Sequence, residues 1–304
     1  DPISISDEHK LRLEKMGAEF YESIPKNEDE LFDRVKDAEI ITANYIDLPQ
    51  TILSKLPKLK YIVVPAVGYE WIDVEYATTN GVVCLNCPTH NSQAVAEHAL
   101  ALIFSVNKKI VESAVSLRSG NWDYDYFIGN EIGGKQVGLV GYGNIGKRIE
   151  KMCLGLGLQV SYVNSKSNTE QLNTLLRESD IICICAPLTG STRDLIGESQ
   201  FKLMKQSAIL INVGRGAILD QTTLKQALIS NRIRGAGLDV FADEPLTGIP
   251  SNEIVELAKL NNVVATPHIA YNTQETKGRL GEELINNIQS CIDGKPINRI
   301  RATS

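Results

Sequence analysis

The glycine-rich turn at residues 139–146, Leu-Val-Gly-Tyr-Gly-Asn-Ile-Gly, constrains the fold of this chain more than any other segment. It joins an apolar run at residues 137–140 to a helical pattern marked by Ile145, Ile149 and Met152. The arrangement is the G-x-G-x-x-G of a βαβ unit, whose glycines allow a tight turn, close approach of a phosphate and close helix–strand packing. The helix N-terminus adds free N–H groups and a positive dipole. The turn therefore predicts a pyrophosphate site that includes Gly141, Tyr142, Gly143 and Gly146, and a glycine turn without a ligand is the alternative.

The predicted second strand, Leu156–Val163, lacks the acidic residue that usually binds the adenosine ribose of NAD. Asn164 occupies that position, and no Asp or Glu occurs from residue 158 to residue 169. Ser165, Lys166 and Ser167 place a cation and two hydroxyls there instead. These groups attract the 2′-phosphate that an aspartate would repel. We therefore predict a preference for NADP(H), with NAD(H) as the other option if this segment is only a solvated loop.

Composition limits the other classes of function. A length of 304 residues with 43% hydrophobic content suggests about two domains with real cores. The net charge of −6 comes with no basic stripe, which argues against nucleic acid and anionic membranes as partners. The longest apolar helix candidate, Ala94–Val106, is interrupted by Glu97 and His98 and is too short to span a membrane. With no secretory signal in the sequence, we expect a cytoplasmic protein.

The six cysteines predict small buried hydrophobes in a reducing compartment. Cys84 and Cys87 form a C-x-x-C, for which redox chemistry or half of a metal site is the alternative. No second pair completes a zinc set, and Pro88 follows directly. We predict no metal.

Short apolar strands alternate with helical patterns along the whole chain, which is typical of doubly wound α/β proteins. The early strands are predicted at residues 39–43, 60–65 and 81–85, and a long helix from Ser92 follows them. Residues 271–304 show helical spacing at Leu280, Leu284 and Ile288 and are expected to return to the first domain. We predict an α/β fold of two doubly wound domains, in which a Rossmann-type dinucleotide-binding domain (96–270) is inserted into a smaller flavodoxin-like substrate domain (1–95 plus 271–304). Because the chain opens directly on a helical pattern, we expect a short strand to precede it.

The downstream half carries an arginine, a carboxylate and a histidine after three predicted strands. The strand Ile209–Val213 leads into Gly214-Arg215-Gly216, and the segment 237–241 precedes Asp243-Glu244-Pro245. The strand at 262–265 leads into Thr266-Pro267-His268-Ile269-Ala270. Ligands bind at such strand ends. Taken singly, these residues also suit a surface ion pair, a helix start and a loop histidine.

In this order behind the glycine turn, the motifs resemble the D-isomer-specific 2-hydroxyacid dehydrogenase family. The resemblance spans most of the chain and includes Ala-Val-Gly-Tyr-Glu-Trp-Ile-Asp at 66–73, Ala-Val-Ala-Glu-His at 94–98 and Ala-Pro-Leu-Thr at 186–189. It implies hydride transfer between a nicotinamide cofactor and a small-molecule 2-oxo acid, and a homodimer formed through the cofactor domain. Asn164 departs from the NAD-linked members.

The resemblance also implies a role for each matching residue. His268 would donate the proton, with Glu244 favouring its protonated form and fixing its orientation. Arg215 would hold the substrate's carboxylate and carbonyl oxygen, together with the backbone N–H groups of Val67 and Gly68. The remaining cofactor contacts would be Asn144 and Ile145 under the pyrophosphate, Ala186, Pro187 and Thr192 along the nucleotide edge, and Val213, Gly214 and Asp239 on the nicotinamide side.

The sequence says less about which acid is reduced. The loop Thr42-Ala43-Asn44-Tyr45 lacks the arginine usual in the similar phosphoglycerate dehydrogenases, so it offers no cation for a second anionic group. Several aromatic residues suggest an apolar or aromatic wall, and core packing explains some of them equally well: Tyr45, Tyr69, Trp71, Trp122, Tyr124, Tyr126 and Phe127. We predict a glyoxylate- or hydroxypyruvate-like substrate, with a bulkier apolar 2-oxo acid as the alternative. A nicotinamide-sensing protein similar to transcriptional corepressors, or an idle scaffold, would bind cofactor without turnover.

Overall fold

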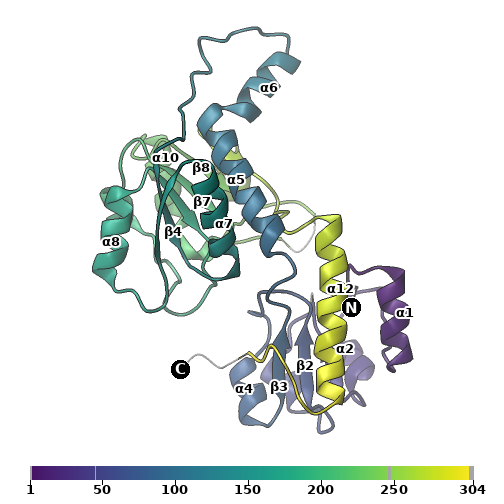
Figure 1. Cartoon of the computed structure of the whole chain (residues 1–304). Helices are drawn as coiled ribbons and strands as arrows, with labels where there is room; N and C mark the ends of the chain where they lie inside the picture. Colours follow the sequence, from purple (N-terminus) through teal and green to yellow (C-terminus); the bar gives the residue numbers. More distant parts are fainter. Residues whose placement is uncertain (1, 45, 246–247, 301–304) are drawn as a thin grey trace. The chain divides into compact units, whose positions relative to one another are not determined.

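The computed structural model describes residues 2–44, 46–245 and 248–300, and the chain divides into two compact units (Figure 1). Unit 1 consists of residues 1–91 and 272–304, and unit 2 consists of residues 92–271. The chain therefore passes from one unit to the other twice. The first passage lies at the start of the helix Ser92–Lys108, whereas the predicted limit at residue 95 falls inside that helix.

In its described residues, unit 1 has a parallel sheet of three strands in the order β1-β2-β3. Its elements are α1 (Asp7–Lys15), α2 (Glu28–Val35), β1 (Ile40–Thr42), α3 (Gln50–Leu53), β2 (Tyr61–Val64), α4 (Val74–Thr79), β3 (Val83–Asn86) and α12 (Gln274–Ile292). Successive strand residues point to opposite faces. Ile62 and Val64 accordingly pack with residues of α2, α3 and α4, while Val63 packs with residues of α1 and α12. The predicted early strands are confirmed.

Helix α12 closes the second face of this sheet. Leu280, Leu284 and Ile288 are buried, which confirms the return of the C-terminal segment to the first domain. On the opposite face, Cys84 lies in the core of β3, and burial raises the pKa of its thiol to about 12. Cys87 is also buried, and its pKa is likewise raised by burial. Both thiols are free and behave as buried hydrophobes.

The same helix holds the segment through which the chain leaves unit 1. The Glu283 carboxylate accepts hydrogen bonds from the N–H groups of Thr89 and His90, at 3.2 and 2.9 Å, and from the Thr89 hydroxyl at 2.9 Å. Arg279 Nε donates to the His90 carbonyl at 2.7 Å. Burial alone would raise the pKa of the Glu283 carboxyl, but hydrogen bonds with His90 and Thr89 bring that pKa below its usual value.

In the part of the chain that the structure describes, unit 2 has a parallel sheet of six strands in the order β5-β4-β6-β7-β8-β9. Its elements are α5 (Ser92–Lys108), α6 (Ile110–Arg118), β4 (Gln136–Val140), α7 (Asn144–Gly155), β5 (Gln159–Val163), α8 (Thr169–Glu178), β6 (Ile181–Ile184), α9 (Glu198–Leu203), β7 (Ile209–Asn212), a 3₁₀ turn (Gly216–Ile218), α10 (Gln221–Ile229), β8 (Gly235–Leu238), α11 (Asn252–Ala258) and β9 (Val263–Ala265). The order reverses at β4, which lies between β5 and β6. Ligands of open α/β sheets bind at such a reversal, outside the carboxyl ends of the strands.

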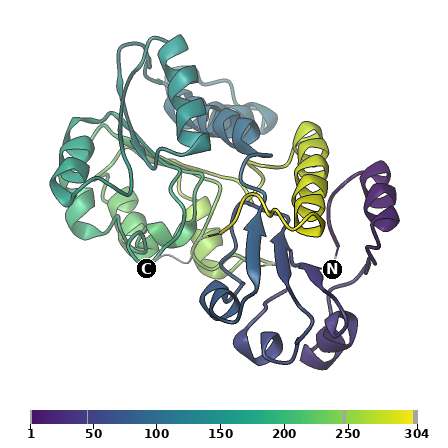
Figure 2. The ribbon, with the colours of Figure 1, turned by 60° about the horizontal axis from the view of Figure 1, so that its bottom comes forward.

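Helices cover both faces of this sheet (Figures 1 and 2). One core joins the strands to α5 and α7, and the other joins them to α8, α9, α10 and α11. The predicted two-domain α/β fold with a Rossmann-type unit is confirmed. One strand differs from its prediction: β5 begins at Gln159 rather than Leu156, because Leu156 caps α7 and Gly157 follows with a positive φ of 76°. In the described residues, no helix is both long and apolar enough to cross a membrane.

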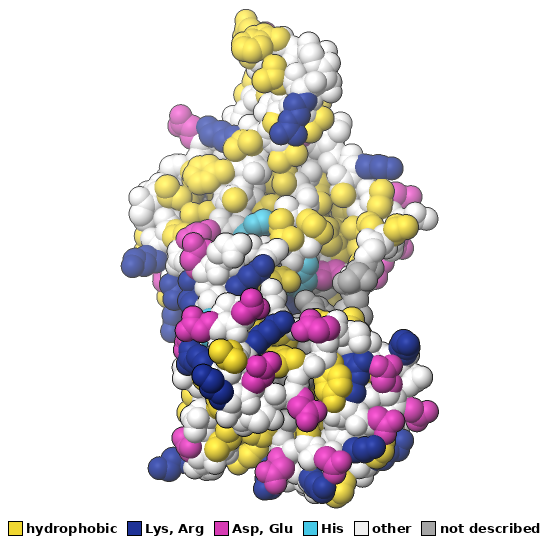
Figure 3. Space-filling model, turned by 90° about the vertical axis from the view of Figure 1, so that its right-hand side faces the viewer, with side chains coloured by type: hydrophobic (Ala, Val, Ile, Leu, Met, Phe, Trp, Pro, Cys, Tyr) yellow, Lys and Arg dark blue, Asp and Glu magenta, His cyan; other side chains and the backbone are white. Residues whose placement is uncertain are grey.

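Residues 109–131, which we call the arm, project from the rest of unit 2 (Figure 1). The arm contains α6, none of whose residues is buried. Its exposed large hydrophobic residues are Ile110, Val111, Val115, Leu117, Trp122, Tyr124, Tyr126 and Ile128. Figure 3 shows hydrophobic side chains gathered at the projecting end. These aromatic residues are thus not core residues, and Trp122 leaves 82% of its surface exposed.

Candidate active site

The turn after β4 has the geometry that its glycines predict. Gly141 has a φ of 103°, and a Cβ there would lie 2.5 Å from the Ala186 nitrogen. A Cβ at Gly146 would lie 2.7 Å from the Gly141 carbonyl oxygen. At Gly143, in contrast, a Cβ would meet nothing within 4 Å, and this N-cap residue of α7, which precedes Asn144 and Ile145, makes no side-chain cap hydrogen bond. A helix N-terminus without a side-chain cap beside open space fits a pyrophosphate.

The Tyr142 side chain contacts other residues of unit 2. Its ring stacks on Tyr162 with centroids 3.6 Å apart and planes 5° from parallel. Its hydroxyl donates a hydrogen bond to the Glu150 carboxylate, which raises the pKa of Tyr142 to about 12. The part of Tyr142 that serves the turn is therefore its backbone.

The segment after β5 is an exposed turn built around Asn164. The Asn164 side-chain oxygen accepts the N–H of Lys166 at 2.9 Å, and its own N–H donates to the Ser167 hydroxyl at 3.1 Å. This Asx turn fixes the backbone of residues 164–167. Ser165 and Lys166 are exposed on it, so a cation and a hydroxyl are available to a ligand phosphate.

The ends of β6 and β7 lie against the glycine turn. Cys185 Sγ lies 3.0 Å from the Gly141 carbonyl oxygen, and a Cβ at Gly214 would lie 2.8 Å from the Ala186 oxygen. After Ala186, the Thr192 hydroxyl donates to the Pro187 carbonyl at 2.7 Å and closes the loop. Val213 is buried beside them. The structure thus brings these predicted cofactor residues together at one sheet edge.

Arg215 lies in the turn that follows β7, and hydrogen bonds with the Asn212 side chain hold this turn. The buried Asn212 side chain donates to the Arg215 carbonyl at 3.0 Å and accepts the Gly214 N–H at 3.0 Å. Arg215 in turn donates to the Gly214 carbonyl at 2.8 Å. Asn212 was not among the predicted site residues, although an asparagine that precedes Val-Gly at a strand end is a recognisable turn signal.

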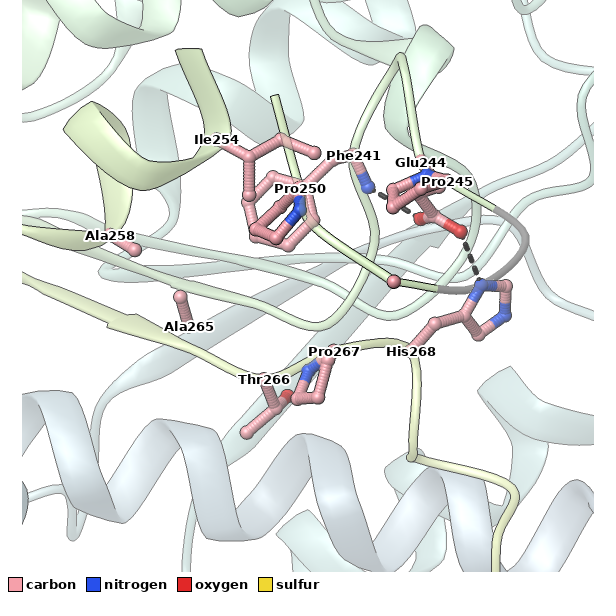
Figure 4. Close-up of a pocket in the computed structure, with 11 residues that line it drawn as sticks. Phe241, Glu244, Pro245, Pro250, Ile254, Ala258, Ala265, Thr266, Pro267 and His268 are labelled. Carbon is pink, nitrogen blue, oxygen red and sulfur yellow. Dashed lines mark hydrogen bonds and ion pairs between the residues drawn. The ribbon is translucent and has the colours of Figure 1, made fainter. Parts of the chain in front are cut away.

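Glu244 and His268 form the pair that the sequence predicts (Figure 4). Glu244 Oε2 lies 2.6 Å from His268 Nδ1, and Glu244 Oε1 accepts the Phe241 N–H at 2.6 Å. The His268 side chain is 40% exposed and that of Glu244 is 27% exposed. His268 has a φ of 51°, a left-handed conformation that is uncommon for residues other than glycine. The Glu244 carboxylate thus fixes Nδ1 of the His268 ring, and the other ring nitrogen, Nε2, points away from the carboxylate.

A pocket of about 370 Å³ lies beside this pair (Figure 4). Its lining residues are Phe241, Glu244, Pro245, Gly248, Pro250, Ile254, Ala258, Ala265, Thr266, Pro267 and His268. Apart from the pair and Thr266, the wall of this pocket is apolar.

Asp239, at the end of β8, holds the segment that carries His268. Its carboxylate is 1% exposed and accepts the Thr266 hydroxyl at 2.6 Å and the N–H groups of Ile269 and Ala270, each at 2.9 Å. The His268 N–H donates to the Asp239 backbone carbonyl at 2.8 Å. The place of Asp239 beside the nicotinamide stays a prediction, whereas its support of the His268 segment was not predicted.

Val67 and Gly68 lie in unit 1, in the loop after β2. The Asn86 side chain donates to the Val67 carbonyl at 2.7 Å, and the Cys87 N–H donates to the Ala66 carbonyl at 3.0 Å. In the same unit, the Trp71 indole donates to the Ala43 carbonyl at 3.2 Å, which joins the loop to the end of β1. Tyr45 lies outside the described residues, so its predicted place in an aromatic wall is not addressed.

Known proteins resemble this chain over most of its length. Residues 100–270 match the family model described as D-isomer specific 2-hydroxyacid dehydrogenase, NAD binding domain. The chain is 36% identical to glycerate dehydrogenase of Methylorubrum extorquens, over 90% of this chain and 89% of that protein. It is 38% identical to glyoxylate reductase of Thermococcus litoralis, over 87% of this chain and 84% of that protein.

Solved structures match the whole chain. An acyclic imino acid reductase in complex with NADPH and D-Arg has a TM-score of 0.90 at 33% identity, covering 99% of this chain and 98% of that one. D-lactate dehydrogenase of Aquifex aeolicus, complexed with NAD and lactic acid, has a TM-score of 0.87 at 30% identity with the same coverage. The chain therefore belongs to the D-isomer specific 2-hydroxyacid dehydrogenase family of NAD(P)-dependent oxidoreductases.

Proposed function

We propose that this enzyme reduces a small 2-oxo acid of the glyoxylate or hydroxypyruvate kind to the D-2-hydroxy acid, with NADP(H) preferred. The observation that carries the proposal is the 2.6 Å Glu244–His268 pair on the same sheet edge as Arg215. These residues follow β8, β9 and β7, which are adjacent parallel strands. Relatives that are named glycerate dehydrogenase and glyoxylate reductase support the substrate class.

The turn at 141–146 would hold the cofactor's pyrophosphate, and the bound nicotinamide would supply the hydride. Glu244 occupies Nδ1 of His268, so the proton for the substrate's oxygen would be held at Nε2. The Phe241 N–H fixes the carboxylate and therefore the direction of the ring.

Arg215 would bind the substrate carboxylate through its forked guanidinium, which matches two oxygens at once. We propose that the N–H groups of Val67 and Gly68 bind the same carboxylate. Asn212 sets the Arg215 backbone through two 3.0 Å hydrogen bonds, so the guanidinium starts from a fixed turn.

The substrate is tested with purified protein and NADPH against glyoxylate, hydroxypyruvate, pyruvate, phenylpyruvate and a branched 2-oxo acid, followed by the absorbance of the reduced nicotinamide. Oxidation with glyoxylate or hydroxypyruvate would support the proposal. Faster oxidation with phenylpyruvate or the branched acid would favour the bulkier class of substrate. Tight cofactor binding without oxidation by any acid would contradict the proposal and favour a nicotinamide-sensing protein.

The cofactor preference is tested by the double substitution of Asn164→Asp and Lys166→Ala. The aspartate repels a 2′-phosphate and the second change removes its cation, so the ratio of NADPH to NADH efficiency should fall at least about tenfold. Lys259→Ala, an exposed lysine after α11, serves as the control. An unchanged ratio in the double variant would refute the assignment of this turn to a phosphate.

A second candidate reaction is the reduction of an acyclic 2-imino acid. The observation that favours it is the whole-chain similarity to the acyclic imino acid reductase. An imino acid presents the same carboxylate beside a C=N bond, and Arg215 would bind it in the same way. NADPH oxidation with each 2-oxo acid, measured with and without a saturating amine, separates the two reactions because only imine reduction requires the amine.

We further propose that the protein is a homodimer formed through the arm of unit 2. The exposed apolar side chains of residues 109–131 are of the kind that an interface covers. Light scattering on the intact protein should give twice the chain mass, and Trp122→Ser with Tyr124→Ser should shift it toward the monomer. A monomeric wild-type protein would contradict this proposal.

A further inference from the structure

His98 is a residue of α5 to which the proposed function gives no role. Its Nε2 lies 3.0 Å from the Thr266 hydroxyl oxygen and 3.4 Å from Asp239 Oδ1. The His98 side chain is 19% exposed, and Asp239 is almost completely buried. Three side chains from α5, β8 and the segment after β9 therefore meet beneath the loop that carries His268.

The protons of this cluster can be assigned from chemistry. A hydroxyl has one proton, and the 2.6 Å contact from Thr266 to Asp239 uses it, because an ionised carboxylate only accepts. Thr266 must therefore accept its second hydrogen bond, and the donor within reach is Nε2–H of His98. The chain of donors thus runs from His98 to Thr266 to Asp239, and it requires a proton on His98 Nε2.

The direction of these hydrogen bonds matters because the Asp239 carboxylate holds the residues before and after His268. Thr266 precedes the histidine, and Ile269 and Ala270 follow it, and all three donate to the Asp239 carboxylate. His268 between them adopts its left-handed backbone with its N–H on the Asp239 carbonyl. If Thr266 rotated, the carboxylate would lose a donor and the anchored segment could shift.

We infer that His98 is a positioning residue for His268, acting through Thr266 and Asp239. His98 fixes the Thr266 hydroxyl, the hydroxyl fixes the Asp239 carboxylate, and the carboxylate fixes the two sides of the loop. This inference rests on the proposed role of His268 as proton donor. It goes beyond that role because it assigns a function to a helix residue whose described polar partners are Thr266 and Asp239 rather than the Glu244–His268 pair.

The first test compares His98→Leu with His98→Gln, whose amide retains an N–H donor. A misplacement of about 1 Å can cost about 10²-fold in rate. We expect His98→Leu to lower kcat by about 10- to 100-fold, with the KM of the oxo acid and the Kd of NADPH within about twofold of wild type. His98→Gln should recover most of kcat. His9→Leu, at a buried histidine of unit 1, is the control and should leave kcat unchanged.

A double-mutant cycle tests the route. Thr266→Val is nearly isosteric and removes the hydroxyl, so it should lower kcat by the same factor as His98→Leu. Because both break the same chain of donors, the double variant should lose little more than either single variant. Additive losses would overturn the route through Thr266.

The second readout does not depend on turnover. The chain has four histidines, so the imidazole NMR signals of His268 can be assigned by their loss in His268→Gln. These signals should shift or broaden in His98→Leu and return toward wild type in His98→Gln. Unchanged His268 signals together with unchanged kcat would overturn the inference, and so would a kcat loss that His98→Gln does not recover. If the wild type reduced no substrate, the proposed function would fail while the NMR comparison would still test the positioning.

Discussion

Asp239→Asn is expected to destabilise unit 2 although the two side chains have nearly the same shape. The carboxylate receives donors on both oxygens, Thr266 and Ile269 on Oδ1 and Ala270 on Oδ2. An asparagine must turn its NH₂ toward one of these groups. The less costly orientation keeps Oδ1 as the oxygen and leaves the Ala270 N–H, which is buried, facing another donor.

The cost follows from these contacts. An unsatisfied buried N–H costs about 1–3 kcal/mol, and changing two charge-assisted hydrogen bonds to neutral ones costs about 1 kcal/mol each. Relief of a buried charge offsets part of this sum. We expect a net loss of about 2–3 kcal/mol in the free energy of unfolding.

Guanidinium chloride denaturation followed by far-ultraviolet circular dichroism measures this loss. Asp243→Asn is the matched control, because Asp243 is exposed and its one described hydrogen bond, to the Gln221 amide, is 3.4 Å long. The control should stay within about 0.5 kcal/mol of wild type. A loss of less than about 0.5 kcal/mol in Asp239→Asn would refute the view that Asp239 supports the His268 segment through these bonds.

The remaining predictions concern catalysis, substrate binding and pH. His268→Ala should lower kcat by about 10²–10⁴-fold while cofactor binding, measured by fluorescence titration, is retained; near-normal turnover would contradict its role. Arg215→Lys should raise the KM of the oxo acid at least about tenfold, because lysine lacks the fork, and an unchanged KM would count against it. Glu283→Gln should destabilise unit 1 at about pH 7, and the difference from wild type should shrink as the pH falls below about 4. The native pKa of Glu283 is lowered, so its contribution is present above the unfolded value and is lost as the pH falls through the native one, and a pH-independent difference in unfolding free energy would contradict this.

Local patterns predicted much of the fold and the principal residues of the site. The apolar runs that became β4, β6 and β7 are completely or almost completely buried, and such runs can be recognised in the sequence alone. Glu244 and His268 were found because each follows a strand in a distinctive motif, and the structure brings them to 2.6 Å.

The parts that were missed depend on contacts between distant segments. His98 and Thr266 are 168 positions apart, and nothing near His98 in the sequence indicates that its ring meets a hydroxyl rather than core side chains. The start of β5 was placed too early because Leu156 is apolar, whereas Gly157 with its positive φ continues the helix cap. The exposure of Trp122 could not be predicted either, since an aromatic residue in a sequence indicates a buried side chain more often than an exposed one.

Because α12 is synthesised near the end of the chain, unit 1 can be completed only late in translation. Unit 2 is one continuous stretch, so all of its strands and helices are available once residue 271 has been made. Unit 1 is made first but is completed last, because the sheet face that contains Val63 and Leu85 is covered by α12. Residues of α1 also pack on this face, but until α12 emerges from the ribosome the face lacks the cover that α12 supplies, while the whole of unit 2 is being translated. The nascent chain must therefore keep its earliest sheet from aggregating for longer than any other part of the molecule.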